Sequence, residues 1–334
     1  MKPVIFGVSG LTLTAEERDF FRDADPLGYI LFKRNCGDRA QMKALTDALR
    51  KVSGRADVPI LIDQEGGRVS RMVPPEWPAF PAGEAFGRLY DVAPISAIEA
   101  ARANYHALAL MLREVGVNVD CAPLLDVAQP EVTVAIGDRA FGGEPMRVGA
   151  LGKAAVEGLR RGGVVGVVKH MPGHGRAVVD SHLELPRVHV DAAALETDIE
   201  PFHAVRDAPM GMTCHVVFEA WDATNPATLS PKVISEIVRG RIGFDGLLMT
   251  DDIDMKALSG TPGEKACAAL AAGCDVVLDC WARMDEMIEI AGLLPHASPE
   301  CLARLDRAMA SIAGGPQGDL AELVAKRDEL LALA

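Results

Sequence analysis

The sequence predicts an α/β fold, a single (β/α)8 barrel of the TIM type with extra helices at its C-terminal end. Short apolar, β-rich runs recur eight times along the 334 residues, with helical segments between them. Nearly all of these runs are continuously hydrophobic, which is typical of strands buried on both faces in a parallel sheet. Because no linker or shift in composition divides the chain, we expect one barrel domain over residues 1–334.

The eight expected strands are separated by segments with a helical pattern. The strands cover residues 4–8, 29–32, 60–62, 117–121, 164–168, 211–214, 246–250 and 275–278. The helical segments lie at about residues 15–24, 40–52, 94–115, 147–161, 192–206, 231–239 and 264–272, and two or three more helices follow from about Met284. A doubly wound open sheet is the alternative, but no Gly-x-Gly-x-x-Gly motif follows the first strand.

Composition argues against several classes of protein. The formal net charge of -13 disfavours a nucleic-acid or anionic-membrane partner. No apolar run approaches the roughly 18–20 residues that span a bilayer, and the N-terminal apolar run stops at Gly7, which predicts a strand rather than a signal peptide. The seven cysteines include no Cys-x-x-Cys pair, so we expect reduced thiols and a cytoplasmic location. A monomer is the default expectation.

Polar residues gather where the expected strands end. These residues are Asp63, Gln64, Glu65, Asp120, Lys169, His170, His215, Asp251 and Asp252. The fifth strand is followed by a long loop, residues 172–186, which adds His174, Arg176, Asp180 and His182. Loops of this length are uncommon inside compact domains unless they are functional. Since barrel enzymes carry their sites at the C-terminal ends of the strands, we expect one polar site at the mouth of the barrel.

Three residues are candidates for the chemistry itself. Asp251 directly follows an apolar strand and is a candidate nucleophile, metal ligand or helix cap. His182 lies two residues after Asp180, and the two can pair if the loop turns locally. A carboxylate bonded to an imidazole orients it and favours its protonated form, which gives a general acid near neutral pH. A solvated loop histidine is the alternative for His182.

Other polar groups are candidates for binding. His170 and His174 stand four residues apart, a spacing that suits two metal ligands on a helix, but the proline and glycine between them disfavour a helix. We therefore expect no metal site. Lys169 is a candidate hydrogen-bond donor to ligand hydroxyls, with a buried ion pair as the alternative. Arg71 and Arg139 would supply local positive charge at the mouth, with a surface or ion-paired role as their alternative.

These motifs together resemble the family 3 glycoside hydrolases, in particular the single-domain cytosolic β-N-acetylglucosaminidases of the NagZ type. The resemblance rests on residues 28–35, 63–71, 138–141, 169–182, 226–230 and 246–255 and covers nearly the whole chain. Its most specific parts are the loop Lys-His-x-Pro-Gly-His-Gly…Asp-Ser-His and the Thr-Asp-Asp after the seventh strand. Met171 and Arg176 depart from the usual residues of the family, outside the expected catalytic set.

The resemblance implies a retaining exo-β-N-acetylglucosaminidase that works in two steps. Asp251 matches the nucleophile that forms a covalent glycosyl-enzyme, and His182 matches the acid/base, with Asp180 as its partner. The residues that match those holding the terminal N-acetylglucosamine are Asp63, Arg71, Arg139, Lys169 and His170. No metal or organic cofactor is implied.

The implied substrate is a peptidoglycan fragment with a terminal non-reducing N-acetylglucosamine, namely GlcNAc-1,6-anhydroMurNAc with or without peptide, released in cell-wall recycling. This small sugar or muropeptide is the one partner implied, and a basic rim of Arg71, Arg139 and Arg176 would suit its carboxylates. The alternatives are a phosphorylase on the same scaffold, substrate-assisted catalysis, a β-glucosidase of the same family, a metal-dependent amidohydrolase and a non-catalytic sugar-binding protein.

Overall fold

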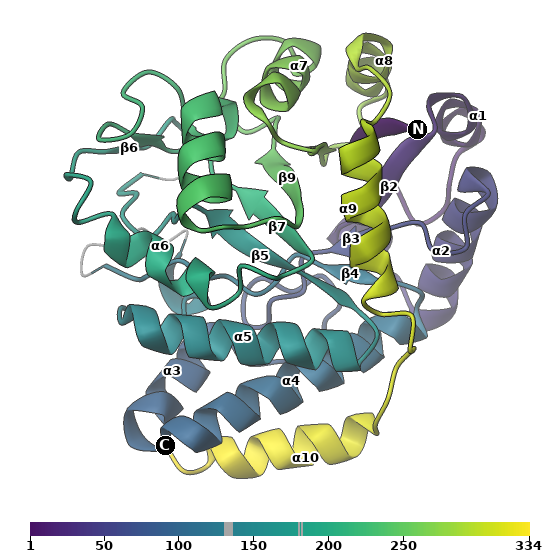
Figure 1. The fold of residues 1–334 in the computed structure, drawn as a ribbon. Helices are drawn as coiled ribbons and strands as arrows, with labels where there is room; N and C mark the ends of the chain where they lie inside the picture. The colour runs from purple at the N-terminus through teal and green to yellow at the C-terminus, as the bar shows by residue number, and fades with distance from the viewer. Residues whose placement is uncertain (130–135, 180, 182) are drawn as a thin grey trace.

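Eight parallel strands close into a barrel in the computed structural model of the chain (Figure 1), which describes residues 1–129, 136–179, 181 and 183–334. The barrel strands are β1 (Lys2–Gly7), β2 (Pro26–Leu31), β3 (Ile60–Ile62), β4 (Val119–Asp120), β5 (Val165–Met171), β7 (Met210–Thr213), β9 (Leu247–Asp252) and β10 (Val276–Asp279). Neighbours in sequence are neighbours in the barrel, and β10 pairs with β1 to close it. The predicted α/β barrel is confirmed, and the closed sheet excludes the doubly wound alternative.

Helices surround the strands. They are α1 (Ala15–Ala24), α2 (Arg39–Ser53), α3 (Gly83–Val92), α4 (Pro94–Glu114), α5 (Pro145–Arg161), α6 (Glu196–His203), α7 (Pro262–Ala272), α8 (Met284–Leu293), α9 (Pro299–Ala310) and α10 (Leu320–Leu331). Three 3-10 turns are η1 (Lys33–Asn35), η2 (Gly137–Arg139) and η3 (Ala227–Leu229), and the π-helical η4 covers Val233–Arg241, where the sequence predicts a helix at 231–239. The expected C-terminal helices are α8, α9 and α10, and α10 lies across α4 (Figure 1).

The continuous apolar runs follow from burial on both faces of the sheet. In β1, Val4 and Phe6 pack in the cluster between the strands and the surrounding helices, whereas Ile5 packs inside the barrel. Leu305 and Met309 of α9 belong to the same interior cluster as Ile5. Since α9 packs against the barrel interior with these apolar side chains, the opposite end, where the strands finish, is left for polar groups.

Local signals explain where some helices begin. Thr14 and Glu17 form a capping box at the start of α1, and Thr261 and Glu264 form one at the start of α7. In each box two backbone N–H groups that the helix cannot pair are bonded by side chains. The helix expected at 192–206 is shorter in the structure, where it covers Glu196–His203.

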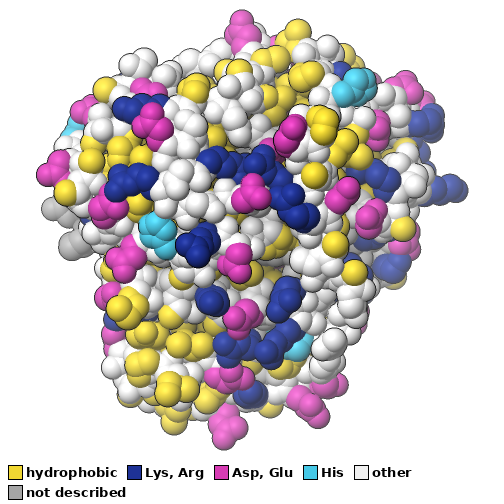
Figure 2. Space-filling model, viewed as in Figure 1, with side chains coloured by type: hydrophobic (Ala, Val, Ile, Leu, Met, Phe, Trp, Pro, Cys, Tyr) yellow, Lys and Arg dark blue, Asp and Glu magenta, His cyan; other side chains and the backbone are white. Residues whose placement is uncertain are grey.

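One small sheet was not predicted. Strands β6 (Arg187–Val188) and β8 (Val217–Phe218) pair in parallel outside the barrel, and two residues are too few to leave a periodic pattern. On the surface in Figure 2, Lys and Arg side chains are interspersed with Asp and Glu side chains. Among the described residues, none of the helices is both long enough and apolar enough to cross a membrane.

Candidate active site

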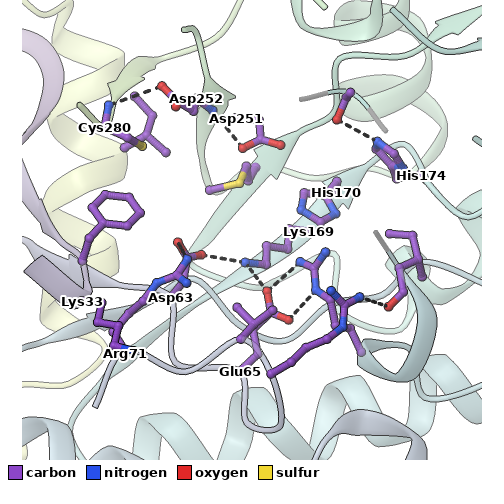
Figure 3. A pocket seen from close by; sticks show the side chains of 18 of the residues that line it. Lys33, Asp63, Glu65, Arg71, Lys169, His170, His174, Asp251, Asp252 and Cys280 are labelled. Atoms are coloured by element: carbon purple, nitrogen blue, oxygen red, sulfur yellow. Dashed lines mark hydrogen bonds and ion pairs between the residues drawn. The ribbon is translucent and has the colours of Figure 1, made fainter. Parts of the chain in front are cut away.

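A cavity of about 610 Å³ opens where the barrel strands end, as the predicted site requires. Its walls come from the ends of β5, β7, β9 and β10 and from the segments that follow β2, β3, β4, β5 and β10 (Figure 3). Five expected binding residues line it, namely Asp63, Arg71, Arg139, Lys169 and His170, and Asp251 lines it as well. Side chains from segments far apart in the sequence therefore meet at one mouth.

One side of the cavity is a network of paired charges around Lys169. The buried ammonium of Lys169 lies 2.9 Å from Asp63 Oδ1 and 2.7 Å from Glu65 Oε1. Arg139 donates to both oxygens of Glu65, at 2.8 and 2.7 Å, and Arg71 donates to Asp63 Oδ2 at 3.2 Å. Every charge here has a partner, and the carboxylate oxygens keep further lone pairs that can accept hydrogen bonds from ligand hydroxyls.

The network fixes the protonation states of its members. Burial lowers the pKa of Lys169, but the carboxylates of Asp63 and Glu65 outweigh burial and raise it above the ordinary value of a lysine. Burial raises the pKa of Asp63, but Lys169 and Arg71 bring it below its ordinary value. Lys169 is thus a permanent cation and Asp63 a permanent acceptor at neutral pH.

The turn after β3 aims Arg71 back into the cavity. Gln64 accepts the backbone N–H groups of Arg71 and Met72 at 2.8 and 3.0 Å, and its own N–H donates to the buried Asp120 at 2.9 Å. At Gly66, φ is 101° and a Cβ would lie 2.2 Å from a backbone oxygen, so this position requires glycine. Asp120 was expected at the mouth, but it does not line the cavity and instead holds this turn through the N–H of Gln64.

The end of β9 presents Asp251. One oxygen of its carboxylate accepts the N–H of Asp252 at 2.8 Å, and the group points toward the centre of the cavity (Figure 3). Burial raises the pKa of Asp251, but His170 and His215 together with the Asp252 N–H bring it below its ordinary value. Helix α7 begins at Pro262, so Asp251 does not cap a helix. The side chain is therefore an ionised carboxylate directed at the cavity.

His215 holds the backbone behind Asp251. The buried imidazole donates from Nε2 to the carbonyl oxygen of Asp252 at 2.9 Å, and its Nδ1 lies 2.8 Å from Thr228 Oγ1. Burial lowers the pKa of His215. Burial also raises the pKa of Asp252 to about 6, and its carboxylate accepts the N–H of Cys280 at 3.3 Å. These contacts tie the end of β9 to its neighbours on both sides.

A buried carboxylate that sequence reasoning missed orients His170. Asp126 Oδ2 accepts the His170 Nδ1–H at 2.7 Å, and Oδ1 accepts the backbone N–H of His174 at 2.6 Å. The Nε2 atom of His170 is therefore the ring nitrogen left for the cavity. Burial lowers the pKa of His174 to about 4, which makes it neutral, and its Nε2 lies 3.3 Å from Ser181 Oγ. Asp126 lies six residues after the end of β4, so its position in the sequence does not mark it as a strand-end residue.

Glu65 stands at a strand end in the sequence but is not among the expected binding residues. Its two oxygens hold Lys169 and Arg139 together, and the side chain is 6% exposed. The sequence signal that could have identified Glu65 as a binding residue is its place two residues after Asp63, at the end of the third strand. One expectation is wrong: Arg176 does not line the cavity and adds no charge to a basic rim there, since its guanidinium is turned to Asp198 at 2.5 Å and to the Ala194 carbonyl.

The two residues predicted to supply the acid lie outside the described part of the chain. They are Asp180 and His182. Ser181, between them in sequence, is described: it is buried, it lines the cavity, and its carbonyl accepts the N–H of Ala257 at 3.2 Å. His170 and His174 have rings 5.7 Å apart. Within residues 1–129, 136–179, 181 and 183–334, no three potential ligands gather to hold a metal ion.

An ionised carboxylate beside paired donors and acceptors, at the mouth of a parallel barrel, is the arrangement of a barrel enzyme's active site. The comparison with family models then gives the family. Residues 8–313 match the glycosyl hydrolase family 3 N terminal domain, and the chain belongs to this family of glycoside hydrolases. The predicted resemblance is confirmed, and the metal-dependent amidohydrolase alternative is wrong.

Individual proteins similar to this chain are β-hexosaminidases or have a solved structure of the same fold. A β-hexosaminidase of Xylella fastidiosa strain M23 is 40% identical over 301 residues, which are 86% of this chain and 87% of that protein. One of Chromobacterium violaceum is 38% identical and covers 91% of this chain and 86% of its own. The crystal structure of NagZ from Neisseria gonorrhoeae in complex with N-trifluoroacetyl-D-glucosamine matches with a TM-score of 0.87, at 30% identity over 100% of this chain and 98% of that one.

Proposed function

We propose that residues 1–334 form a single catalytic domain that acts as a retaining exo-β-N-acetylglucosaminidase. The observation that carries the proposal is the ionised carboxylate of Asp251, held by the backbone of Asp252 and directed into a cavity whose opposite wall is the Asp63–Lys169 pair. The sugar specificity is supported by the names of the relatives, which are β-hexosaminidases, and by the N-acetylglucosamine analogue in the related crystal structure.

The non-reducing sugar would bind in the inner, polar part of the cavity. Asp63 accepts hydrogen bonds from its hydroxyls, and Lys169 and Arg71 donate to them. His170, oriented by Asp126, adds a ring nitrogen at the same wall. Because these groups are already paired and buried before substrate arrives, little reorganisation is needed when the sugar binds.

Hydrolysis would proceed through a covalent intermediate. In the first step an oxygen of Asp251 attacks the anomeric carbon while the glycosidic bond breaks, and His182 gives its proton to the departing oxygen. In the second step His182 takes a proton from water, which attacks the same carbon and releases the sugar and Asp251. Two displacements at one carbon retain its configuration. These residues need no metal or organic cofactor.

The acid/base assignment rests on the family motif. Ser181, the neighbour of both Asp180 and His182, lines the cavity, which supports the assignment. A neutral imidazole in the second step does not repel an incoming anion as a carboxylate would, so phosphate could replace water and give a sugar 1-phosphate. Phosphorolysis on the same scaffold is therefore a measurable alternative.

The proposed substrate is a cytoplasmic peptidoglycan fragment, GlcNAc-1,6-anhydroMurNAc with or without peptide, in cell-wall recycling. Its carboxylates would meet cations at the cavity edge, where Lys33 is exposed and Arg71 lies further in. An enzyme of the same family with another specificity would use the same catalytic residues but bind a different non-reducing sugar. A β-glucosidase, for example, would turn over glucosides and leave N-acetylglucosaminides intact.

The test is release of p-nitrophenol from its β-N-acetylglucosaminide by wild type, Asp251→Ala and His182→Ala. We expect Asp251→Ala to lose several orders of magnitude in kcat/KM. We expect His182→Ala to lose less on this good leaving group than on a disaccharide, because p-nitrophenolate needs little protonation. Full activity in Asp251→Ala would overturn the mechanism. Activity on glucosides alone would overturn the substrate assignment.

A further inference from the structure

The outer wall of the cavity carries an exposed indole. Exposure rises steeply along the segment that leaves β10: Leu278 is 2% exposed, Cys280 7% and Trp281 54%, and all three line the cavity. The other two tryptophans of the chain, Trp77 and Trp221, are 4% and 6% exposed. Trp281 thus stands where the cavity meets solvent, and its indole ring is a large apolar surface exposed to solvent.

The backbone before Trp281 is held in place, and the residue after it has an unusual conformation. Ala282 has a φ of 58°, in the left-handed region that residues other than glycine seldom adopt. Such a conformation persists when its surroundings fix it. Here the Cys280 carbonyl accepts a hydrogen bond from Arg34, whose Nε–H donates to the carbonyl of Val8 at 2.8 Å. The turn that presents the indole is therefore tied to the end of β1.

A cation covers part of the indole. The Arg283 guanidinium lies 5.6 Å from the centroid of the Trp281 ring, at cation–π distance. Arg283 is itself held by Asp254 at 3.2 Å and by Glu286 at 2.9 Å. The ring therefore has a cation on it that is itself held by two carboxylates, and Trp281 also lines the cavity. A rigid aromatic surface loses little conformational entropy when a ligand stacks on it.

The chemistry of the two ends of the cavity differs. The inner end, with Asp63, Lys169 and His170, offers charges and hydrogen bonds, whereas the outer wall at Trp281 offers an apolar plane. A pyranose ring has polar edges and an apolar C–H face that packs on such a plane. We propose that Trp281 is the stacking platform for the leaving group and that this subsite takes a second sugar ring. The proposal rests on the proposed function only in assigning the inner end to the non-reducing sugar.

Kinetics with matched leaving groups test the platform. Wild type, Trp281→Ala and Trp281→Phe are compared on the β-1,4-disaccharide of N-acetylglucosamine and on its methyl β-glycoside, which lacks the second ring. We expect Trp281→Ala to lose about tenfold in kcat/KM on the disaccharide, equivalent to about 1.4 kcal/mol of lost stacking. The same variant stays within about twofold of wild type on the methyl glycoside, and Trp281→Phe keeps most of the preference for the disaccharide.

A control variant separates stacking from general loss of surface. Ile288 of α8 is 55% exposed, comes seven residues after Trp281 and does not line the cavity. Ile288→Ala is expected to leave both rates unchanged. Equal losses on the two substrates in Trp281→Ala, or no loss on the disaccharide, would overturn the proposal.

Fluorescence gives an independent measurement. Since Trp77 and Trp221 are buried, quenching by iodide reports mainly on Trp281. The non-hydrolysable S-linked disaccharide should protect Trp281 from iodide, whereas N-acetylglucosamine alone should not. Protection by the monosaccharide alone would place the inner sugar at Trp281 and overturn the assignment. If no N-acetylglucosaminide is cleaved, the proposed function fails, and the same comparison on cellobiose and methyl β-glucoside still decides whether Trp281 binds the leaving group.

Discussion

Replacing Asp126 by Asn tests whether a buried carboxylate positions the sugar-binding histidine. Asp126 is fully buried: Oδ2 accepts the N–H of His170 Nδ1 at 2.7 Å, and Oδ1 accepts the backbone N–H of His174 at 2.6 Å and that of His170 at 3.4 Å. An asparagine has one acceptor oxygen and one NH2 group. Its oxygen can accept from the His170 ring or from the two backbone N–H groups, and its NH2 group cannot accept from the other side unless the proton of His170 moves from Nδ1 to Nε2.

The size of the effect follows from this count. One buried donor left without a partner costs about 1–3 kcal/mol, so we expect the free energy of unfolding to fall by that amount. If His170 changes tautomer instead, its cavity nitrogen becomes a different hydrogen-bonding group. A loss of about 1.4–2.7 kcal/mol in transition-state binding would lower kcat/KM about 10- to 100-fold.

The assay combines kinetics on p-nitrophenyl β-N-acetylglucosaminide with urea unfolding. Asp222→Asn is the matched control, because the Asp222 carboxylate also accepts several hydrogen bonds, from Thr224, Asn225 and Ser230, but does not line the cavity. We expect Asp222→Asn to lose stability and keep its activity. If Asp126→Asn lost stability while keeping kcat/KM, Asp126 would be structural and would not act through His170.

Two further predictions concern buried carboxylates, and a third concerns the acceptor of the sugar. Glu65→Gln should lower kcat/KM at least tenfold and stability by about 1–3 kcal/mol, because Lys169 and Arg139 lose a shared buried carboxylate; unchanged kinetics would show that Glu65 does not position them. Burial raises the pKa of Asp279 to about 8, so this group favours the fold below pH 4 and loses that contribution as pH rises to 8. Between pH 5 and 8 the free energy of unfolding of wild type, measured with urea, should therefore fall by a few kcal/mol relative to that of Asp279→Asn, at about 1.4 kcal/mol per pKa unit. Parallel pH profiles of the two proteins would contradict this. In phosphate buffer, N-acetylglucosamine 1-phosphate among the products would identify phosphorolysis, whereas we expect free N-acetylglucosamine.

The fold could be predicted because its signal is local. Nearly all barrel strands are apolar on both faces, as Val4, Ile5 and Phe6 illustrate, and this pattern can be seen in the sequence. The paired strands β6 and β8 are too short to leave such a pattern.

The site could be predicted only where it follows the strand ends. Asp63, Lys169 and Asp251 stand there and line one cavity. Asp126 and the pairing of Arg176 with Asp198 depend on how loops fold onto other elements, over separations of 44 and 22 residues. No periodicity or spacing marks contacts of that kind, which is why Asp126 was missed and Arg176 was misplaced.

Asp251 is the residue proposed to form the covalent intermediate. The direct measurement is mass spectrometry of the protein after reaction with a 5-fluoro N-acetylglucosaminyl fluoride, followed by peptide mapping. A slow deglycosylation step should let the glycosyl-enzyme accumulate, with the added mass on the peptide that contains Asp251. An adduct mapped to another residue would contradict this role of Asp251. So would an Asp251→Ala variant that forms no adduct but releases fluoride as fast as wild type.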